Sequence, residues 1–493
     1  MKINLKLVVC LLTVLVFSVG LNYVLVSNLE RQIMSQPPSQ PSFLNVKITP
    51  RDVKLHVNET QVFTATVNDG TAPYSYTWKR DMNITLGYEQ NISFSFSVAT
   101  PYAMLSVDVV DSRNRVGYDF VKVEDPYSSS NVYLNTFGMP YRYLIEADGL
   151  GWYRAINGSN GAIDYSGTSV ATVTKSSLDA MIASSTYFGT LHFAKGAYLF
   201  TTEVLMERTL SAGLKEGLIV EGEGRYATVL AAIGAHSVFK FHGYSRDDRF
   251  ESFTFRSLEI TSDATTRSAG DHGLVFINAT FVNIYDCFIV GCYDSGIYME
   301  GLEGNFIHEC GIYGNKGNGV EIVNACDTFI TSNSIDFNEL NGISVIYAVT
   351  MSIEHNLISY SGQCGIFLYW GTKDSTVGDN KIAVNGRDGI FLAADCDNDT
   401  ISDNVIYENS VTTTNTYNGI RITDSSNNVL IGNRIFDETG VAPCQKWGIL
   451  EDGTSDYNTI IGCNTRGGST GGIFKTGTNT HVNLCWNNTV WIP

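Results

Sequence analysis

The chain has 493 residues, of which 50 are acidic and 32 are basic, so its formal net charge is −18 with histidine neutral. This acidic balance argues against a nucleic-acid binder, because contact with phosphate needs clustered Lys and Arg. Charged residues make up only 17% of the chain and hydrophobic residues 44%, which excludes wholesale disorder. The 46 glycines and only 10 prolines indicate a turn-rich β protein.

The N-terminus carries an uncharged run from Leu7 to Leu29, preceded by two lysines. A run of this length crosses about 30 Å of hydrocarbon as a helix, and the preceding lysines place the N-terminus inside. We therefore expect residues 1–30 to be a signal-anchor helix, with the bulk of a single-pass cell-membrane protein extracellular. A cleaved signal peptide is the alternative, since Ser18 and Gly20 suit a cleavage site. Residues 31–43 are rich in Pro, Ser and Gln and form a linker.

Residues 44–125 contain short runs in which polar and apolar residues alternate, which indicates an antiparallel β-sandwich. The runs are Val53–Val57, Gln61–Val67, Tyr74–Lys79, Ile92–Val98 and Leu105–Val110. The stretch Gly70–Trp78 (Gly-Thr-Ala-Pro-Tyr-Ser-Tyr-Thr-Trp) resembles the polycystic-kidney-disease (PKD) and related immunoglobulin-like domains of surface proteins. This resemblance implies a spacer or adhesion module.

The C-terminal two-thirds repeat with a period near 23 residues. A Gly followed by an apolar residue opens each unit, at Gly273, Gly296, Gly319, Gly342, Gly365, Gly389, Gly419, Gly448 and Gly472. A second marker follows each of the first eight glycines by 14 or 15 residues, at Cys287, Cys310, Asn333, Asn356, Asn380, Asn404, Asn433 and Cys463. This pattern is typical of a β-solenoid.

Each unit is expected to form one coil of a right-handed parallel β-helix, stacked about 4.8 Å on the next. We expect about 10–12 coils over residues 176–490, preceded by a lead-in segment at 126–175. The Asn markers then form an interior ladder, because a buried amide must find partners. Cys287 and Cys310 occupy this position in adjacent coils, within disulfide range of each other, or form a row of thiols.

The stretches Gly189–Phe200 and Gly217–Leu230 resemble the first coils of the pectate-lyase superfamily. Gly222-Glu-Gly224 fits that pattern, whereas Ala194 replaces the family's usual Pro. The resemblance implies a right-handed parallel β-helix with a short N-terminal capping helix, for which residues 176–185 have suitable spacing. It further implies enzymes that act on polysaccharides, although fold does not determine function.

Outward positions two and four residues after each Gly carry recurring aromatic residues. The aromatic positions are Tyr298, Phe367, Tyr369, Phe391 and Phe474. Exposed aromatic rows suit sugar binding, unless turns or the stretch Asn131–Asp164 fold back over this face and bury them. Two insertions, Glu408–Asn418 and Glu438–Trp447, are expected to form a wall beside Phe367, Phe391 and Arg421, with Tyr417, Trp447 and Asp437 on it. Tolerated insertion without function is the alternative.

Glu300 and Glu321 are the candidate catalytic residues. They occupy outward positions in adjacent coils, roughly 8 Å apart, inside the window of about 6.5–9.5 Å for an inverting glycosidase. Ordinary solvated glutamates are the alternative. No metal site is assigned, although calcium is one candidate cofactor for the segment Asp395–Asp399, which turn chemistry explains equally well. Six histidines show no metal-ligand spacing and are expected to be structural: His192, His236, His242, His308, His355 and His481.

The sequence therefore predicts a membrane-anchored extracellular β-helix protein whose partner is a polysaccharide or cell-surface glycan. Two functions stay open at this point. One is a lyase, glycoside hydrolase or epimerase acting on polysaccharide. The other is a non-catalytic module that binds glycans or serves as a structural component of the envelope.

Overall fold

The structure is a computed structural model that describes residues 44–492 apart from short gaps. The gaps are 52, 56–58, 69, 81–83, 97–101, 114, 125–140, 148–150, 185–186, 208–214, 246–248, 302, 438–443, 467 and 488–489. The predicted anchor at 1–30 and linker at 31–43 lie outside the described residues. Among the described helices, none has the length and apolar character needed to cross a membrane. The chain divides into two compact units between Ser128 and Ser129.

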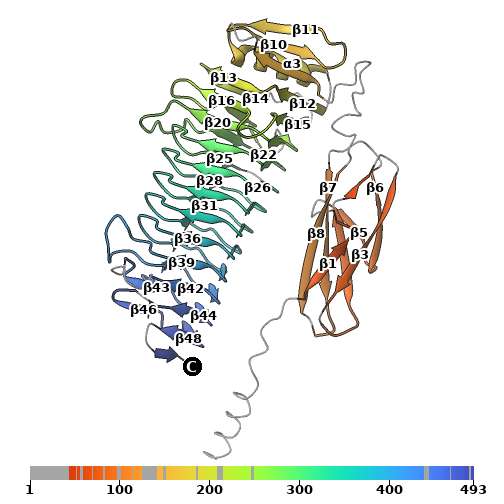
Figure 1. Cartoon of the computed structure of the whole chain (residues 1–493). Helices are drawn as coiled ribbons and strands as arrows, with labels where there is room; N and C mark the ends of the chain where they lie inside the picture. The colour runs from red at the N-terminus through yellow and green to blue at the C-terminus, as the bar shows by residue number, and fades with distance from the viewer. Residues whose placement is uncertain are drawn as a thin grey trace, which may run out of the picture. The chain divides into compact units, whose positions relative to one another are not determined.

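The N-terminal unit consists of two sheets that enclose one hydrophobic core, drawn in red and orange in Figure 1. One sheet has the order β1 (Val46–Thr49), β3 (Thr60–Val67) and β6 (Asn91–Ser95). The other has the order β2 (Val53–Lys54), β8 (Val116–Glu124), β7 (Tyr102–Val110), β4 (Ser75–Arg80) and β5 (Ile84–Gly87). All pairs are antiparallel except β2 with β8, which is parallel. Membership of the PKD class stays a prediction.

Trp78 lies at the centre of this core. Its side chain is fully buried, together with Phe63 and Val107, and its indole Nε1 donates a hydrogen bond to the carbonyl of Glu89 at 2.9 Å. The indole N–H is thus satisfied inside an apolar core, as buried polar groups require. The alternating pattern of the sequence places Trp78 on the inner face of β4, as period two demands.

The second unit begins with a cap made of β9 (Tyr143–Ala147), β10 (Tyr153–Asn157), β11 (Ile163–Gly167) and helix α3 (Val170–Ser184). The helix starts six residues before the predicted capping helix and buries Val170, Leu178 and Met181 in the core of the coils. Strand β9 pairs in parallel with β12 (Tyr187–Phe193). The described parts of the stretch 131–164 therefore lie at this end of the β-helix, as Figure 1 shows, and do not cover the aromatic positions of later coils.

Sheet 1 is the sheet that follows the repeated glycines, and all its strands are parallel. Over the described residues it has 11 strands. They are β14 (Val204–Glu207), β17 (Phe239–His242), β21 (Leu274–Ile277), β25 (Ile297–Glu300), β28 (Val320–Val323), β31 (Ile343–Ile346), β34 (Ile366–Tyr369), β37 (Ile390–Ala393), β40 (Ile420–Thr423), β43 (Trp447–Asp452) and β46 (Gly471–Phe474).

Sheets 2 and 3 follow sheet 1 within each coil. Sheet 2 continues from β12 through β15 (Lys215–Glu221), β18 (Phe250–Glu251), β19 (Thr254–Arg256), β22 (Ala279–Thr280), β23 (Asn283–Tyr285), β26 (Phe306–His308), β29 (Phe329–Thr331), β32 (Ser352–Glu354), β35 (Thr376–Gly378), β38 (Thr400–Ser402), β41 (Val429–Ile431), β44 (Thr459–Ile461) and β47 (His481–Asn483). Sheet 3 contains β13 (Gly196–Phe200), β16 (Thr228–Ala232), β20 (Glu259–Ser262), β24 (Phe288–Val290), β27 (Gly311–Tyr313), β30 (Ser334–Asp336), β33 (Leu357–Ser359), β36 (Lys381–Ala383), β39 (Val405–Tyr407), β42 (Arg434–Phe436), β45 (Asn464–Thr465), β48 (Cys485–Asn487) and the antiparallel β49 (Val490–Ile492).

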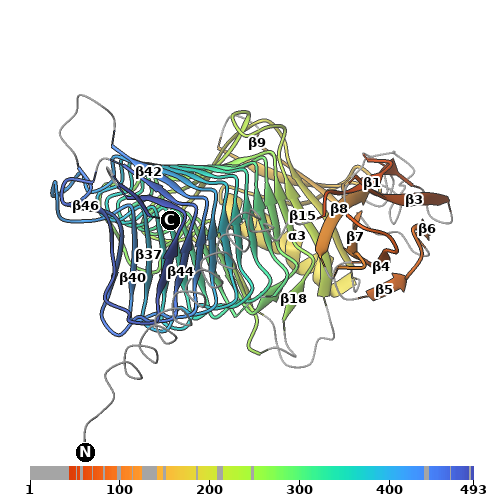
Figure 2. The same ribbon diagram turned by 90° about the horizontal axis from the view of Figure 1, so that it is seen from below.

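The predicted parallel stacking is confirmed. Figure 2 shows the coils one behind another. In sheet 1 the outward position two residues after each Gly pairs directly with its equivalent in the next coil, from Val275 through to Phe474. Side chains far apart in sequence are therefore neighbours along this row. The inward residues, such as Ile297 and Met299, are fully buried.

The predicted Asn ladder lies inside the turn between sheets 2 and 3. From Asn333 to Asn433 the amide Nδ2 of each Asn donates to the Oδ1 of the next at 3.0 Å. Each Nδ2 also donates to an interior carbonyl, as Asn380 does to Ile353 at 2.7 Å. Cys287 and Cys310 are buried free thiols in this row, so the thiol alternative holds and the disulfide does not.

Candidate functional site

The outer face of sheet 1 carries two groups of side chains along its axis. A polar group lies on β25 and β28 and the turns before them, and an aromatic group lies on β34, β37 and β40. Strands in a sheet are about 4.8 Å apart, so the strip from β25 to β40 spans about 24 Å. Only β31 separates the two groups.

Glu300 and Glu321 lie in the polar group, and both are half-buried. The Ser295 hydroxyl donates to Glu321 Oε2 at 2.6 Å, and Asn318 Nδ2 donates to the same oxygen at 3.0 Å. The Tyr298 hydroxyl donates to Glu300 Oε2 at 2.8 Å. Tyr298 pairs with Glu321 across the strands, so the two glutamates are diagonal neighbours, the arrangement that the sequence predicted. Each carboxylate is held in a fixed orientation by a neighbouring donor.

His272 completes this group. Its ring stacks on Tyr298 with 4.5 Å between centroids and 17° between planes. The backbone N–H of Ser295 donates to His272 Nδ1 at 3.1 Å, so the neutral ring carries its proton on Nε2. Burial lowers the pKa of His272, which keeps the ring neutral at pH 7. Burial and the hydrogen bond to Glu300 raise the pKa of Tyr298, so its phenol stays protonated.

An ion pair lies behind His272. Arg267 Nε donates to Asp294 Oδ1 at 2.7 Å, and the N–H of Gly270 donates to Asp294 Oδ2 at 2.8 Å. Asp294 is buried, and its Oδ2 lies 4.0 Å from His272 Nδ1. The sequence analysis gave His272 no role in this group, and the structure places its ring against Tyr298. The available signal was its position directly before Gly273, in the row that contains Ser295 and Asn318 in later coils.

The aromatic group contains Phe367, Tyr369 and Phe391. The Phe367 ring lies 5.2 Å from Tyr369 and 5.3 Å from Phe391, both in stacked orientation. The Arg421 guanidinium lies 4.8 Å from the Phe391 centroid and pairs with Asp452 at 3.0 Å. Tyr369 is 36% exposed, whereas Phe367 and Phe391 are half-buried. The described residues thus leave an apolar surface here beside one charged pair.

The structure places the residues predicted for the loop wall in different surroundings. Tyr417 lies at the expected corner, with its ring 5.8 Å from the Arg387 guanidinium. Trp447 begins β43, and its ring packs 5.2 Å from Phe474 in the next coil. The prediction that Asp437 lies on the wall is wrong, because its side chain is buried and accepts hydrogen bonds from two backbone N–H groups. Residues 438–443 of the second insertion lie outside the described residues.

The segment Asp395–Asp399 does not gather its carboxylates around one point. Asp397 pairs with Lys373 at 3.3 Å on the outside of the coil. Asp399 is fully buried, and its Oδ1 accepts the backbone N–H of Ser375 at 2.9 Å. Calcium needs six to eight converging oxygens, so this segment does not form the calcium site considered from the sequence.

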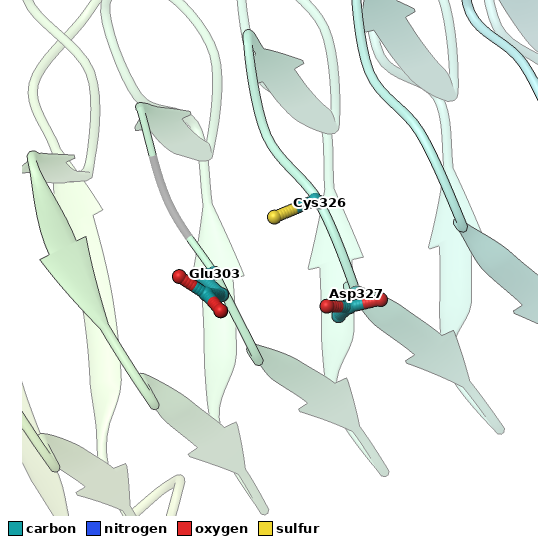
Figure 3. A group of neighbouring side chains, drawn as sticks. All are labelled: Glu303, Cys326 and Asp327. Carbon is teal, nitrogen blue, oxygen red and sulfur yellow. The ribbon is translucent and has the colours of Figure 1, made fainter. Parts of the chain in front are cut away.

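Among the described residues, one group of three side chains has metal-ligating atoms close together. It contains Glu303 on one coil and Cys326 and Asp327 on the next, with their ligand atoms within 4.8 Å of one another (Figure 3). Asp327 Oδ1 also accepts a hydrogen bond from Thr350 at 2.6 Å. Two carboxylates and one thiol fall short of a calcium coordination sphere and lack the imidazole usual in zinc sites. We assign no metal to this group.

Comparison with known proteins supports the fold. The family model described as right handed beta helix region matches residues 244–382 and 295–465. The mannuronan C-5 epimerase AlgE4 A-module of Azotobacter vinelandii is 17% identical, with a TM-score of 0.50, and the match covers 64% of this chain and 96% of that one. The Agl-KA catalytic domain is 12% identical, with a TM-score of 0.50 and 90% of each chain covered. No curated protein matches the sequence. Residues 244–465 thus form a right-handed parallel β-helix, the fold that the resemblance to the pectate-lyase superfamily implied.

Proposed function

We propose that sheet 1 binds a polysaccharide and that the polar group at Tyr298, Glu300 and Glu321 modifies it. The observation that carries this proposal is the continuity of the strip: oriented carboxylates, a neutral imidazole and a protonated phenol lie at one end of an aromatic surface. Binding sites commonly combine an apolar surface with a few placed polar groups. The epimerase with the same fold supports a carbohydrate substrate by analogy only.

The chemistry of the polar group is general acid–base catalysis. Glu300 or Glu321 accepts a proton, Tyr298 donates one, and His272 offers its Nε2–H as a hydrogen-bond donor. Proton transfer is common to lyases, epimerases and glycoside hydrolases, so this group serves any of the three. Phe367, Tyr369 and Phe391 hold the sugar chain, with Arg421, Tyr417 and Trp447 at the far end of the strip.

A non-catalytic glycan-binding module is the second candidate. One observation favours it: the polar group is satisfied within the protein, since Glu321 accepts from Ser295 and Asn318 and Glu300 accepts from Tyr298. Arg421 is likewise paired with Asp452. In this case the whole strip binds glycan, and no covalent bond of the glycan is broken or formed.

Incubation of the protein with a panel of uronic-acid and neutral polysaccharides separates these functions. A lyase gives unsaturated products that absorb in the ultraviolet, and a hydrolase gives new reducing ends without that absorbance. An epimerase changes the uronate composition, which proton NMR detects without chain cleavage. Tyr298→Phe should abolish whichever product forms while leaving binding intact. Binding without any product would support the second candidate and reject the enzyme.

We propose further that residues 1–30 anchor the protein in the cell membrane, with residues 44–125 as a spacer and residues 176–490 extracellular. The length and flanking charge of the apolar run support this placement. Protease treatment of intact cells tests it. Degradation of the β-helix with retention of a membrane-bound N-terminal fragment is expected, and full protection would reject the proposal.

A further inference from the structure

We propose that a hollow on the outer face of sheet 3 is a second carbohydrate site, which takes a neutral sugar residue. The hollow has a volume of about 460 Å³ and is formed by β24, β27, β30 and the turn that carries Arg225 and Tyr226. It belongs to a different sheet from the strip on sheet 1. This site therefore does not depend on the proposed catalytic group.

Gly311 creates the depression. It occupies the outward position between Phe288 and Ser334 in the parallel register, so one strand of the row has no side chain. A Cβ at Gly311 would lie 2.7 Å from Phe288 Cδ2, which shows that the Phe288 ring leans into the vacant position. The floor of the hollow is therefore backbone and one aromatic ring.

Two tyrosines border this floor. The Tyr226 ring lies 5.5 Å from Phe288 at 57° and is 71% exposed. Tyr313 is 42% exposed on β27. The rings of Tyr226 and Tyr313 expose apolar surface to water, and a ligand that covers this surface gains free energy by removing it from water. The C–H face of a sugar ring fits such a surface.

Carboxylates at the edge supply acceptors for sugar hydroxyls. The Ser334 hydroxyl donates to Asp336 Oδ2 at 2.6 Å, and the Ser359 hydroxyl donates to Asp336 Oδ1, so this carboxylate is fixed in orientation. Glu309 lines the same hollow, is exposed, and has no ion pair among the described residues. Each carboxylate oxygen accepts more than one hydrogen bond, which leaves capacity for a ligand.

The charges of the hollow select a neutral sugar. Its charged lining residues are Arg225, Glu309 and Asp336, and Arg225 also faces Asp286 at 3.6 Å. The hollow therefore has two carboxylates and one guanidinium, and Asp286 partly neutralises that guanidinium. The whole chain has a net charge of −18. A uronate would bring a further negative charge to this surface and is disfavoured.

Isothermal titration of the full-length protein with cellohexaose, mannohexaose and xylohexaose tests the site, with galacturonate and mannuronate hexamers as the anionic arm. At least one neutral hexamer should bind, and Tyr226→Ala should weaken this binding at least tenfold. Tyr457→Ala is the matched control, because Tyr457 is a 60% exposed tyrosine outside the hollow, and it should change nothing. Circular dichroism confirms that each variant is folded.

Glu321→Gln separates this site from the proposed active site, since it should leave the neutral-hexamer binding unchanged. Asp336→Asn should weaken the binding severalfold. Failure of every neutral hexamer to bind would overturn the proposal. It would also be overturned if the uronate hexamers bound tightly and Tyr226→Ala abolished that binding. An unchanged affinity in Tyr226→Ala would also overturn it.

Discussion

The polar and aromatic halves of the strip on sheet 1 have the same backbone arrangement but carry side chains of different chemistry. Tyr298 and Glu321 occupy the same outward row as Phe367 and Phe391, and the paired strands keep one register throughout. The inward residues are equivalent as well, since Ile297 and Ile366 are both fully buried. The comparison teaches that the interior of each coil maintains the scaffold, whereas the outward residues are free to differ from coil to coil.

The halves also differ in how their polar groups are engaged. In the polar half, donors from the preceding turns reach the carboxylates, as Ser295 and Asn318 reach Glu321. In the aromatic half, the equivalent turn position holds Cys364 and the buried Asp388, which bonds to Asn418 rather than to the outer face. We therefore expect chemistry in the first half and binding in the second.

Glu321→Gln should abolish the catalytic activity of the polar half and leave the aromatic half unaffected. If Glu321 transfers a proton, the amide cannot replace it, and turnover should fall by about 100-fold to 10,000-fold. Turnover and substrate affinity are measured separately. Glu354→Gln, on β32 of sheet 2, is the matched control and should retain full activity. Equal loss of affinity in Glu321→Gln would assign the residue to binding instead.

Asn380→Ala should destabilise the interior of the coils that carry the aromatic half, at the turn between sheets 2 and 3. Asn380 accepts hydrogen bonds from the backbone and side-chain amides of Asn356 and donates to Ile353 and Asn404. Removal leaves buried partners unsatisfied and should cost about 2–4 kcal/mol. Thermal unfolding and hydrogen exchange measure the loss, which should concentrate in adjacent coils.

The exposed Asn483 on β47 provides the control for that substitution. Asn483→Ala should leave the unfolding temperature unchanged within error. Equal destabilisation by the two variants would show that the ladder contributes nothing specific to the stability of the coils.

Phe391→Ala should weaken the aromatic half without stopping chemistry. Phe391 belongs to the proposed sugar-binding surface, so the substitution removes a ring that stacks on the sugar. A stacking contact worth about 0.5–1.5 kcal/mol corresponds to a fall in substrate affinity of up to about tenfold. The turnover number at saturating substrate should stay within twofold. Phe436→Ala, which removes a stacked ring from sheet 3, serves as the control. A large fall in turnover would contradict the division of the strip.

Asp399→Asn should change the pH dependence of stability of the protein, through the coil that also carries Phe391. Burial raises the pKa of Asp399 to about 8, above its value in an unfolded chain. Between about pH 4 and pH 8 the folded state holds a proton that the unfolded state has lost, so stability falls as pH rises through this range. The amide removes this slope, because it stays neutral.

The variant should gain a few degrees of unfolding temperature at pH 8 and nothing at pH 4. An amide also suits the position, since Asn428 in the next coil donates to the Cys396 carbonyl at 2.9 Å. An unchanged slope of unfolding temperature against pH in the variant would show that Asp399 does not govern it.

The sequence by itself determined the stacked part of this protein. A repeat that starts each coil with a Gly places the residues two and four positions after that Gly in rows, because parallel strands stack in register at a fixed rise. The parallel sheets, the outward rows with Tyr298, Glu321, Phe367 and Phe391, and the Asn ladder followed from that period alone. The diagonal relation of Glu300 and Glu321 followed as well.

Only the tertiary structure decided what happens at the turns. Ala394 and Asp395 adopt φ of 60° and 64°, and these left-handed residues redirect the chain so that Asp399 points inward while Asp397 stays outside. The contact of His272 with Tyr298 and the burial of Asp437 also arise at turns, where the repeat does not specify the direction of a side chain. A period sets the length of a coil, but the direction of a side chain at a corner depends on local φ and ψ and on the packing of the neighbouring coils.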